Sequence, residues 1–104
     1  MWKVSNNSIA MTEGDYGVAL PVTISGVEIA VGDSVKFTVK KGNDTVLEKE
    51  FSSIQHNTVN LELTEQESES LTVGVYVYTL DWYQDGNFMC NIFNGELFKV
   101  VDKA

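Results

Sequence analysis

Arginine is absent from this sequence, and histidine, cysteine and proline occur once each. A lone cysteine excludes an internal disulfide and cannot by itself build a structural zinc site. Fifteen acidic residues against seven lysines give a formal net charge of -8. Nucleic acids and anionic membrane surfaces both select proteins that are rich in Lys and Arg, so the charge balance argues against both kinds of partner.

Long apolar runs are also missing. No stretch approaches the roughly 18 residues of a membrane-spanning helix, and residues 1–7 are too polar to begin a signal peptide. We therefore expect the protein to be made in a cytoplasm and to stay there. Hydrophobic residues make up 43% and charged residues 21% of the chain, which is typical of a globular protein with a packed core. A chain of 104 residues suits one domain spanning 1–104.

Apolar and polar residues alternate with a period of two over most of the chain, which predicts β-strands. Pro21 cannot donate a ladder hydrogen bond, so its strand is expected at a sheet edge or a bulge. The absence of a long helical period, together with turn residues between the segments, predicts an all-β fold. We expect an antiparallel immunoglobulin-like β-sandwich of about seven strands, over residues 18–24, 34–40, 45–51, 59–63, 75–84, 88–93 and 97–101.

One short segment breaks the β pattern. Thr64 and Glu67 have the spacing of a capping box, which predicts a short helical turn near residues 65–70. Acidic side chains at Glu65, Glu67 and Glu69 suit the positive end of such a helix. We interpret this acidic cluster as part of the helix start and not as a metal site, because the sequence links no other acid to it.

The segment Leu71-x-x-Gly74-x-Tyr76 precedes the longest predicted strand. In immunoglobulin-like sandwiches a tyrosine near the start of the sixth strand packs inward and returns its hydroxyl to backbone a few residues upstream, forming a tyrosine corner. Tyr76 is predicted to form this corner. Tyr78 occupies the place of the usual second cysteine, so packing is expected to replace the disulfide.

The register of the last hairpin decides which residues are buried, because a slip of one residue reverses the two faces. A two-residue Asp85-Gly86 turn would mix polar and apolar residues on both faces. A three-residue loop with Asn87 sets Trp82 against Cys90 and Leu80 against Ile92. We choose this register although Asp-Gly favours two-residue turns. It predicts a buried, unreactive Cys90 and a core-facing set of Tyr76, Tyr78, Leu80, Trp82, Cys90 and Ile92.

The opposite face of this hairpin is apolar although it is expected to be half solvated. Exposed patches of this kind usually mark a partner surface. Two alternatives remain open: single exposed apolar residues are ordinary on protein surfaces, or a chain terminus carrying Trp2 covers them. The candidate interface consists of Val75, Val77, Tyr83, Met89 and Phe93.

Catalytic chemistry finds little support. His56 lies in a polar segment and is interpreted as a solvated turn residue, while Cys90 lies on the core-facing side, where nothing would ionise it. The sequence contains no phosphate-binding glycine motif and no EF-hand spacing, so we expect no catalytic, cofactor-binding or metal-binding residues and no enzymatic activity. A carbohydrate-binding platform of Tyr76, Tyr78 and Trp82 is the alternative, but it would bury Asp81.

Several short motifs follow one another in a fixed order along the chain. They are Ile9-x-Met11-Thr12-x-Gly14-Asp15, Gly32-Asp33-x-Val35-x-Phe37-x-Val39, Leu71-x-x-Gly74-x-Tyr76-x-Tyr78, Asp85-Gly86 and Gly95-x-Leu97-Phe98. Each motif consists only of turn glycines and strand hydrophobics. Their order and spacing resemble the N-terminal domain family of phage and prophage baseplate upper proteins from Gram-positive hosts, and the resemblance covers nearly the whole chain.

This resemblance implies a virion structural role in the baseplate or tail, without catalytic residues. The expected partners are other virion proteins or further copies of this chain, and assembly would take place in the bacterial cytoplasm. Longer relatives carry a receptor-binding or fibre portion behind this domain. The sequence has no such portion, so we expect a small assembly or accessory protein. A carbohydrate-binding or adhesin-type module is the alternative function.

Overall fold

A computed structural model describes residues 3–5, 8–17, 20–24, 28–30, 32–52, 54 and 57–102. These residues are mostly β, as predicted, with one small helix. The elements are β1 (Lys3–Ser5), β2 (Ser8–Thr12), β3 (Leu20–Thr23), β4 (Ser34–Lys41), β5 (Asp44–Phe51), β6 (Thr58–Leu61), α1 (Glu65–Glu69), β7 (Gly74–Gln84) and β8 (Asn87–Val101).

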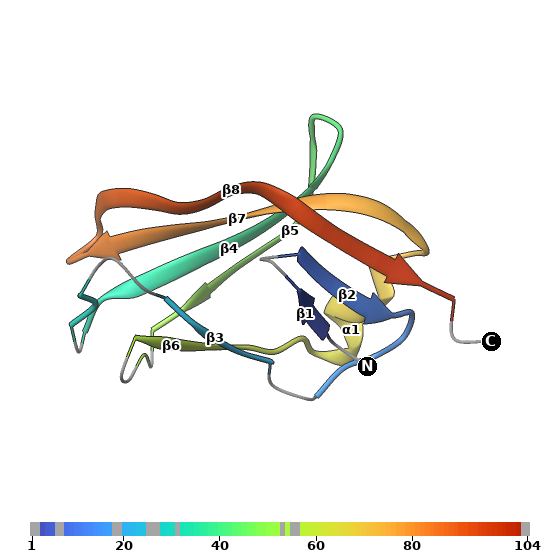
Figure 1. Cartoon of the computed structure of the whole chain (residues 1–104), viewed down its shortest axis with the longest axis horizontal. Helices are drawn as coiled ribbons and strands as arrows, with labels where there is room; N and C mark the ends of the chain where they lie inside the picture. The colour runs from blue at the N-terminus through green and yellow to red at the C-terminus, as the bar shows by residue number, and fades with distance from the viewer. Residues whose placement is uncertain are drawn as a thin grey trace.

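The strands form two sheets. The larger has six strands in the order β1-β2-β8-β7-β4-β5, and the smaller pairs β3 with β6. Figure 1 shows β8, β7, β4 and β5 across the top of the molecule, with β3 and β6 beneath them and β1 and β2 lower down beside α1. Pro21 lies in β3, which pairs with β6 alone, so the expected edge position is confirmed.

A purely antiparallel arrangement is wrong, because β2 pairs with β8 in parallel. Parallel neighbours need a long crossover connection, and here strands β3 to β7 lie between β2 and β8 in sequence. The described residues also contain eight strands where about seven were predicted.

A single apolar core lies between the two sheets. Strands β4, β7 and β8 supply its largest side chains, and the rings of Phe37 and Tyr78 lie 5.6 Å apart. Val22 from β3 and Leu61 from β6 close the core from the smaller sheet. Burial raises the pKa of Tyr78 to about 12, and the negative charge of Glu96 acts in the same direction, so this hydroxyl stays protonated at neutral pH.

The tyrosine corner is confirmed. The Tyr76 side chain is buried, and its hydroxyl donates a 2.8 Å hydrogen bond to the backbone carbonyl of Thr72, four residues upstream. This bond connects the segment after α1 to the start of strand β7. It therefore fixes where β7 begins and, with it, which β7 side chains point inward.

Replacing Tyr76 with phenylalanine is expected to lower the free energy of unfolding by about 1 kcal/mol, because the ring stays buried while the hydroxyl bond to Thr72 is lost. Urea unfolding measures the change. The matched control is Tyr16→Phe, at an exposed tyrosine, where we expect little effect. Equal stability of the Tyr76→Phe variant and the wild type would show that this corner does not stabilise the fold.

The β7–β8 hairpin reaches the predicted register by a different route. Gln84 pairs with Asn87, so the turn has two residues and not three. Asp85 and Gly86 both have positive φ, 51° and 79°, as a type I′ turn requires. A bulge between Trp82 and Tyr83 then shifts the register by one residue. Trp82 consequently pairs with Cys90, as predicted.

Two further bulges follow along β8. Leu80 pairs with Phe93 and not with Ile92, so this part of the predicted register is wrong. The last bulge is at Gly95, where φ is 71°, a conformation that glycine adopts without steric cost. The sequence predicts a bulge or kink at Asn94-Gly95, and this is confirmed.

Cys90 differs from the prediction. It is a free cysteine and is half-buried, so the expectation of a fully buried thiol is wrong. Its partner Trp82 is also only partly buried against the core. The inward-facing residues at this end of the hairpin are only partly buried, so the correct register alone does not enclose the sulfur.

Candidate functional site

The outer face of the large sheet is the side that points away from β3 and β6. Along β7, Tyr76, Tyr78 and Leu80 are buried, so the alternating residues Val75 and Val77 lie on the outer face. Val77 pairs with Leu97 of β8, which places Leu97 on the same face. These three side chains begin an apolar surface over the middle of the sheet.

Two more valines extend this surface at the end of the hairpin. Val73 directly precedes β7 and Val101 ends β8. The exposed fractions are 59% for Val75, 48% for Val73, 45% for Val101 and 42% for Leu97, whereas Val77 is half-buried. We call this set the valine patch: Val73, Val75, Val77, Leu97 and Val101.

The charges at the cross-strand positions next to Val75 and Val77 are positive. Val77 pairs with Lys40 on β4 as well as with Leu97, and Val75 pairs with Lys99 on β8. Both lysines are exposed. Carboxylates therefore occupy none of the cross-strand positions next to Val75 and Val77, although the whole chain carries a net charge of -8. The surface is apolar and has a positive rim beside Val75 and Val77.

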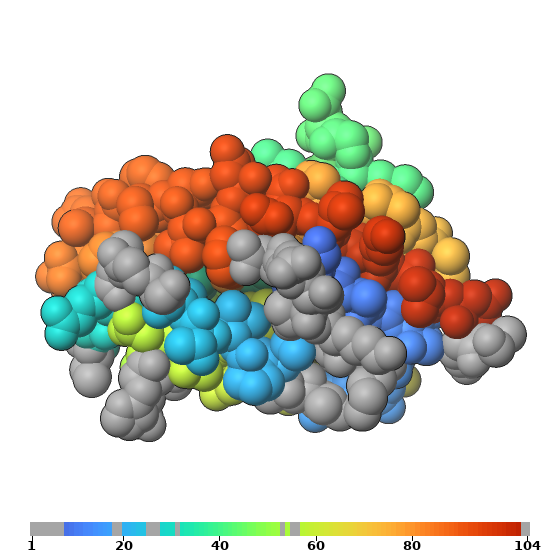
Figure 2. Space-filling model, viewed as in Figure 1, coloured from blue at the N-terminus to red at the C-terminus, as the bar shows by residue number. Residues whose placement is uncertain are grey.

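The turn between β4 and β5 stands beside this face. In Figures 1 and 2 it projects above the large sheet as the green loop at the top of the molecule. Residues 41–45 are all exposed. This projection gives the outer face a raised border next to Lys40.

A second apolar area lies at the other end of the hairpin. The rings of Tyr83 and Phe88 are 5.8 Å apart, and the Lys36 ammonium lies 5.3 Å from the Tyr83 ring centroid. Phe88 and Met89 are exposed, whereas Tyr83 is half-buried. Between the two areas, Asn91 donates a 2.6 Å hydrogen bond to Asp81. The predicted continuous stripe is therefore divided by a polar pair.

Phe93 does not belong to the outer face. It pairs with Leu80 and is packed against the core, and its ring meets that of Tyr78 at 6.2 Å. The reason is the bulge at Ile92, which adds one residue to β8 and reverses the side to which Phe93 points. Of the five predicted interface residues, Val75 and Val77 lie in the valine patch, Tyr83 and Met89 lie near the hairpin turn, and Phe93 faces inward.

Three patch members were missed by the sequence reasoning: Val73, Leu97 and Val101. A signal for two of them exists, because Leu97 and Val101 alternate with buried Phe98 and Val100. These residues follow the Gly95 bulge, and the predicted pairing of the hairpin does not reach beyond that bulge. Val73 stands outside the strand, and only its exposure in the fold identifies it.

The aromatic set considered for carbohydrate binding faces the core. Tyr76 and Tyr78 are buried, so they cannot stack on a sugar ring. Trp82 is partly buried, and its indole nitrogen donates a 2.9 Å hydrogen bond to Asp33. Asp33 is itself buried and also accepts a bond from the Ala30 backbone. The sequence predicts only a turn at Gly32-Asp33, so this buried acceptor was not anticipated.

The acidic cluster at α1 has structural partners. The capping box between Thr64 and Glu67 is confirmed. Glu67 also accepts a 2.8 Å hydrogen bond from Lys49 of β5. Partial burial alone would raise the pKa of Glu67, but the hydrogen bonds from Lys49 and Thr64 outweigh it and hold the pKa below its ordinary value. Among the described residues, no group of three His, Cys, Asp or Glu side chains is arranged to hold a metal ion.

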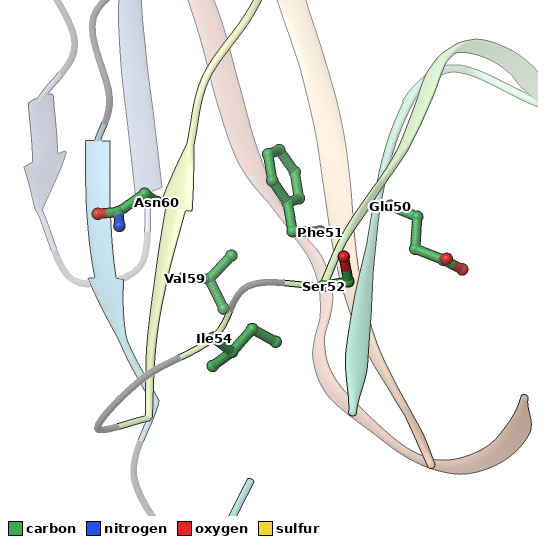
Figure 3. Close-up of a pocket in the computed structure, with 6 residues that line it drawn as sticks. All are labelled: Glu50, Phe51, Ser52, Ile54, Val59 and Asn60. Atoms are coloured by element: carbon green, nitrogen blue, oxygen red, sulfur yellow. The ribbon is translucent and has the colours of Figure 1, made fainter. Parts of the chain in front are cut away.

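A hollow of about 260 Å³ lies between β5 and β6. Figure 3 shows Phe51, Ile54 and Val59 around it, while the Glu50 carboxylate points away. This lining brings together no nucleophile with a base. His56 lies outside the described residues, as does Trp2, so their predicted roles stay predictions.

The helix α1 has five residues. Within the part of the chain that the structure describes, no helix is long and apolar enough to cross a membrane. No protein-family model, curated protein or solved structure matches this chain.

Proposed function

We propose that this chain is a non-enzymatic structural protein of a phage or prophage virion, an assembly or accessory module of the tail or baseplate. It acts by protein–protein association through the valine patch. The observation that carries the association is the patch itself: several exposed aliphatic side chains on one sheet face with lysines at its rim. The resemblance to baseplate upper proteins supplies the virion context and assembly in the bacterial cytoplasm.

An immunoglobulin-like sandwich is the fold that we propose for this module. The order β8, β7, β4, β5 corresponds to strands G, F, C and C′ of the variable-type sheet, and β3 with β6 corresponds to B and E. The tyrosine corner at Tyr76 stands at the start of β7, which takes the place of strand F. These correspondences, and the core shared by the two sheets, support the proposal.

The valine patch has a physical reason to dock on protein. Transferring exposed apolar area out of water is favourable by about 25 cal/mol per Å². A patch on the middle of a sheet is rigid, so little conformational entropy is lost when a partner covers it. Lys40 and Lys99 at the rim would then select a partner with acidic groups around its own apolar contact.

Placing a carboxylate in the patch tests the proposed function. Val75→Glu adds a charge at the most exposed patch position, so it is expected to lower incorporation into virions by at least about tenfold, the effect of roughly 1.4 kcal/mol of lost binding. Incorporation is measured by immunoblotting particles that are pelleted from an induced culture of a bacterium producing the protein.

The matched control is Asn94→Glu, which adds the same charge at an exposed polar residue of β8. It should be incorporated like the wild type. Thermal unfolding establishes that both variants fold, and Val101→Glu replaces Val75→Glu if that variant is unstable. A wild-type protein absent from the particles, or equal incorporation of both folded variants, contradicts the proposal. Binding of the wild type to a glycan array would support the carbohydrate-binding alternative.

A further inference from the structure

A second surface on the molecule combines an exposed aromatic ring with acidic side chains. Tyr16, between β2 and β3, is 50% exposed. The backbone amide of its neighbour Gly17 donates a 2.9 Å hydrogen bond to the carbonyl of Leu63. This bond holds the Tyr16 segment against the residues that lead into α1, where Glu62 and Glu65 are exposed. We call Tyr16, Glu62 and Glu65 the tyrosine–glutamate surface.

The charge of this surface is negative even though a lysine lies close by. Lys49 reaches the same region, since its ammonium donates to the Glu62 backbone carbonyl and to the Glu67 carboxylate. Its charge is therefore matched by Glu67. Glu62 and Glu65 contribute two further exposed carboxylates, in the segment that is hydrogen-bonded to the neighbour of the exposed tyrosine.

The two surfaces lie on different sides of the fold. The valine patch belongs to the outer face of the large sheet, and α1 lies on the other side, beneath that sheet in Figure 1. One copy can therefore use its valine patch for one neighbour and its tyrosine–glutamate surface for another. A contact between unlike surfaces of identical chains continues from copy to copy and gives a ring or an open filament.

Electrostatics favours this contact between unlike surfaces over a symmetric contact of two valine patches. A symmetric contact would bring Lys40 and Lys99 of one copy against the same lysines of the other. Copies that each carry a net charge of -8 also repel one another within a Debye length of about 8 Å at physiological salt. Joining the lysine rim to Glu62 and Glu65 replaces like-charge contacts by opposite-charge contacts where the surfaces meet.

We infer that the occupant of the valine patch is the tyrosine–glutamate surface of a second copy of this chain. The Tyr16 ring is the anchor that covers the valines, and Glu62 and Glu65 face Lys40 and Lys99. Tyrosine suits this role because it brings a large apolar area with few rotatable bonds, and it is enriched among residues that dominate binding. The inference rests on the proposed docking role of the valine patch and adds the identity of the partner.

Complementation between two defective variants tests this inference in sedimentation velocity experiments. Wild-type protein is expected to form species larger than a dimer as its concentration rises. Val75→Glu removes one surface and Tyr16→Ala removes the other, so each variant alone should be monomeric. An equimolar mixture should form a dimer with one copy of each variant and nothing larger, because one intact copy of each surface remains.

The matched control is Tyr16→Phe, which keeps the ring and should assemble like the wild type. If Val75→Glu does not fold, Val101→Glu takes its place. Dimerisation of Tyr16→Ala alone, or no association in the mixture, overturns the head-to-tail contact. A monomeric wild type at every concentration also overturns it, whereas loss of Val75→Glu from virions would still uphold the docking role of the patch.

Discussion

Truncating Phe98 to alanine is expected to lower the free energy of unfolding by about 3–5 kcal/mol, the usual cost of removing a phenylalanine from a core. Phe98 is 0% exposed. Its ring centroid lies 6.0 Å from that of Phe37 and 6.4 Å from those of Tyr76 and Tyr78. It therefore joins strands β8, β4 and β7 at one point. Small domains have only about 5–15 kcal/mol of stability in total, so much of it is expected to be lost.

The neighbouring residue supplies a matched control. Leu97 precedes Phe98 on β8 but is 42% exposed on the outer face. Leu97→Ala should cost less than about 1 kcal/mol, because a surface substitution removes little buried area. Urea unfolding of both variants gives the comparison. Equal losses for Phe98→Ala and Leu97→Ala would mean that the faces of β8 are assigned wrongly, and the valine patch would then lose one of its members.

Strands β7 and β8 show why part of the fold could be predicted. Tyr76 is identified by a local motif, and the two-residue alternation along β7 assigns its faces directly. Along β8, the bulges at Ile92 and Gly95 each add one residue. Two such additions cancel, so Phe98 points inward, as an uninterrupted alternation from Cys90 would require. Only the segment between the bulges is reversed, and this is where Phe93 was assigned to the wrong face.

Other features depend on contacts between distant parts of the chain and leave no local signal. The parallel pairing of β2 with β8 joins residues such as Ile9 and Phe98, which are far apart in sequence. Turn composition identifies Asp33, but nothing in the sequence links it to Trp82. The candidate site was therefore half predicted: the alternation along β7 finds Val75 and Val77. Leu97 and Val101 alternate with Phe98 and Val100, but the pairing of Leu97 with Val77 follows from the observed register.

Removing the Asp33 carboxylate is expected to cost about 3 kcal/mol or more. Asp33 is 3% exposed, and one of its oxygens accepts 2.9 Å hydrogen bonds from the Ala30 backbone and from the Trp82 indole. Hydrogen bonds to a charged group contribute about 1.5–3 kcal/mol each, and Asp33→Ala removes both and leaves two donors without this acceptor. Asp33→Asn keeps an acceptor oxygen and should cost less. Exposed Asp44, where Asp44→Ala should have little effect, is the control.

A double-mutant cycle separates the Trp82 bond from the rest of this loss. Trp82→Phe keeps an aromatic ring but has no donor, so the cycle with Asp33→Ala should give a coupling energy of about 1 kcal/mol or more. A fluorescence measurement supplements the cycle. In a Trp2→Phe background Trp82 is the only indole of the chain, and its fluorescence should change when Asp33→Ala is introduced. Additive effects and unchanged fluorescence would contradict the bond. Coupling would mean that Asp33 fixes the end of the β7–β8 hairpin that carries Tyr83 and Phe88, leaving the valine patch at the other end as a separate surface.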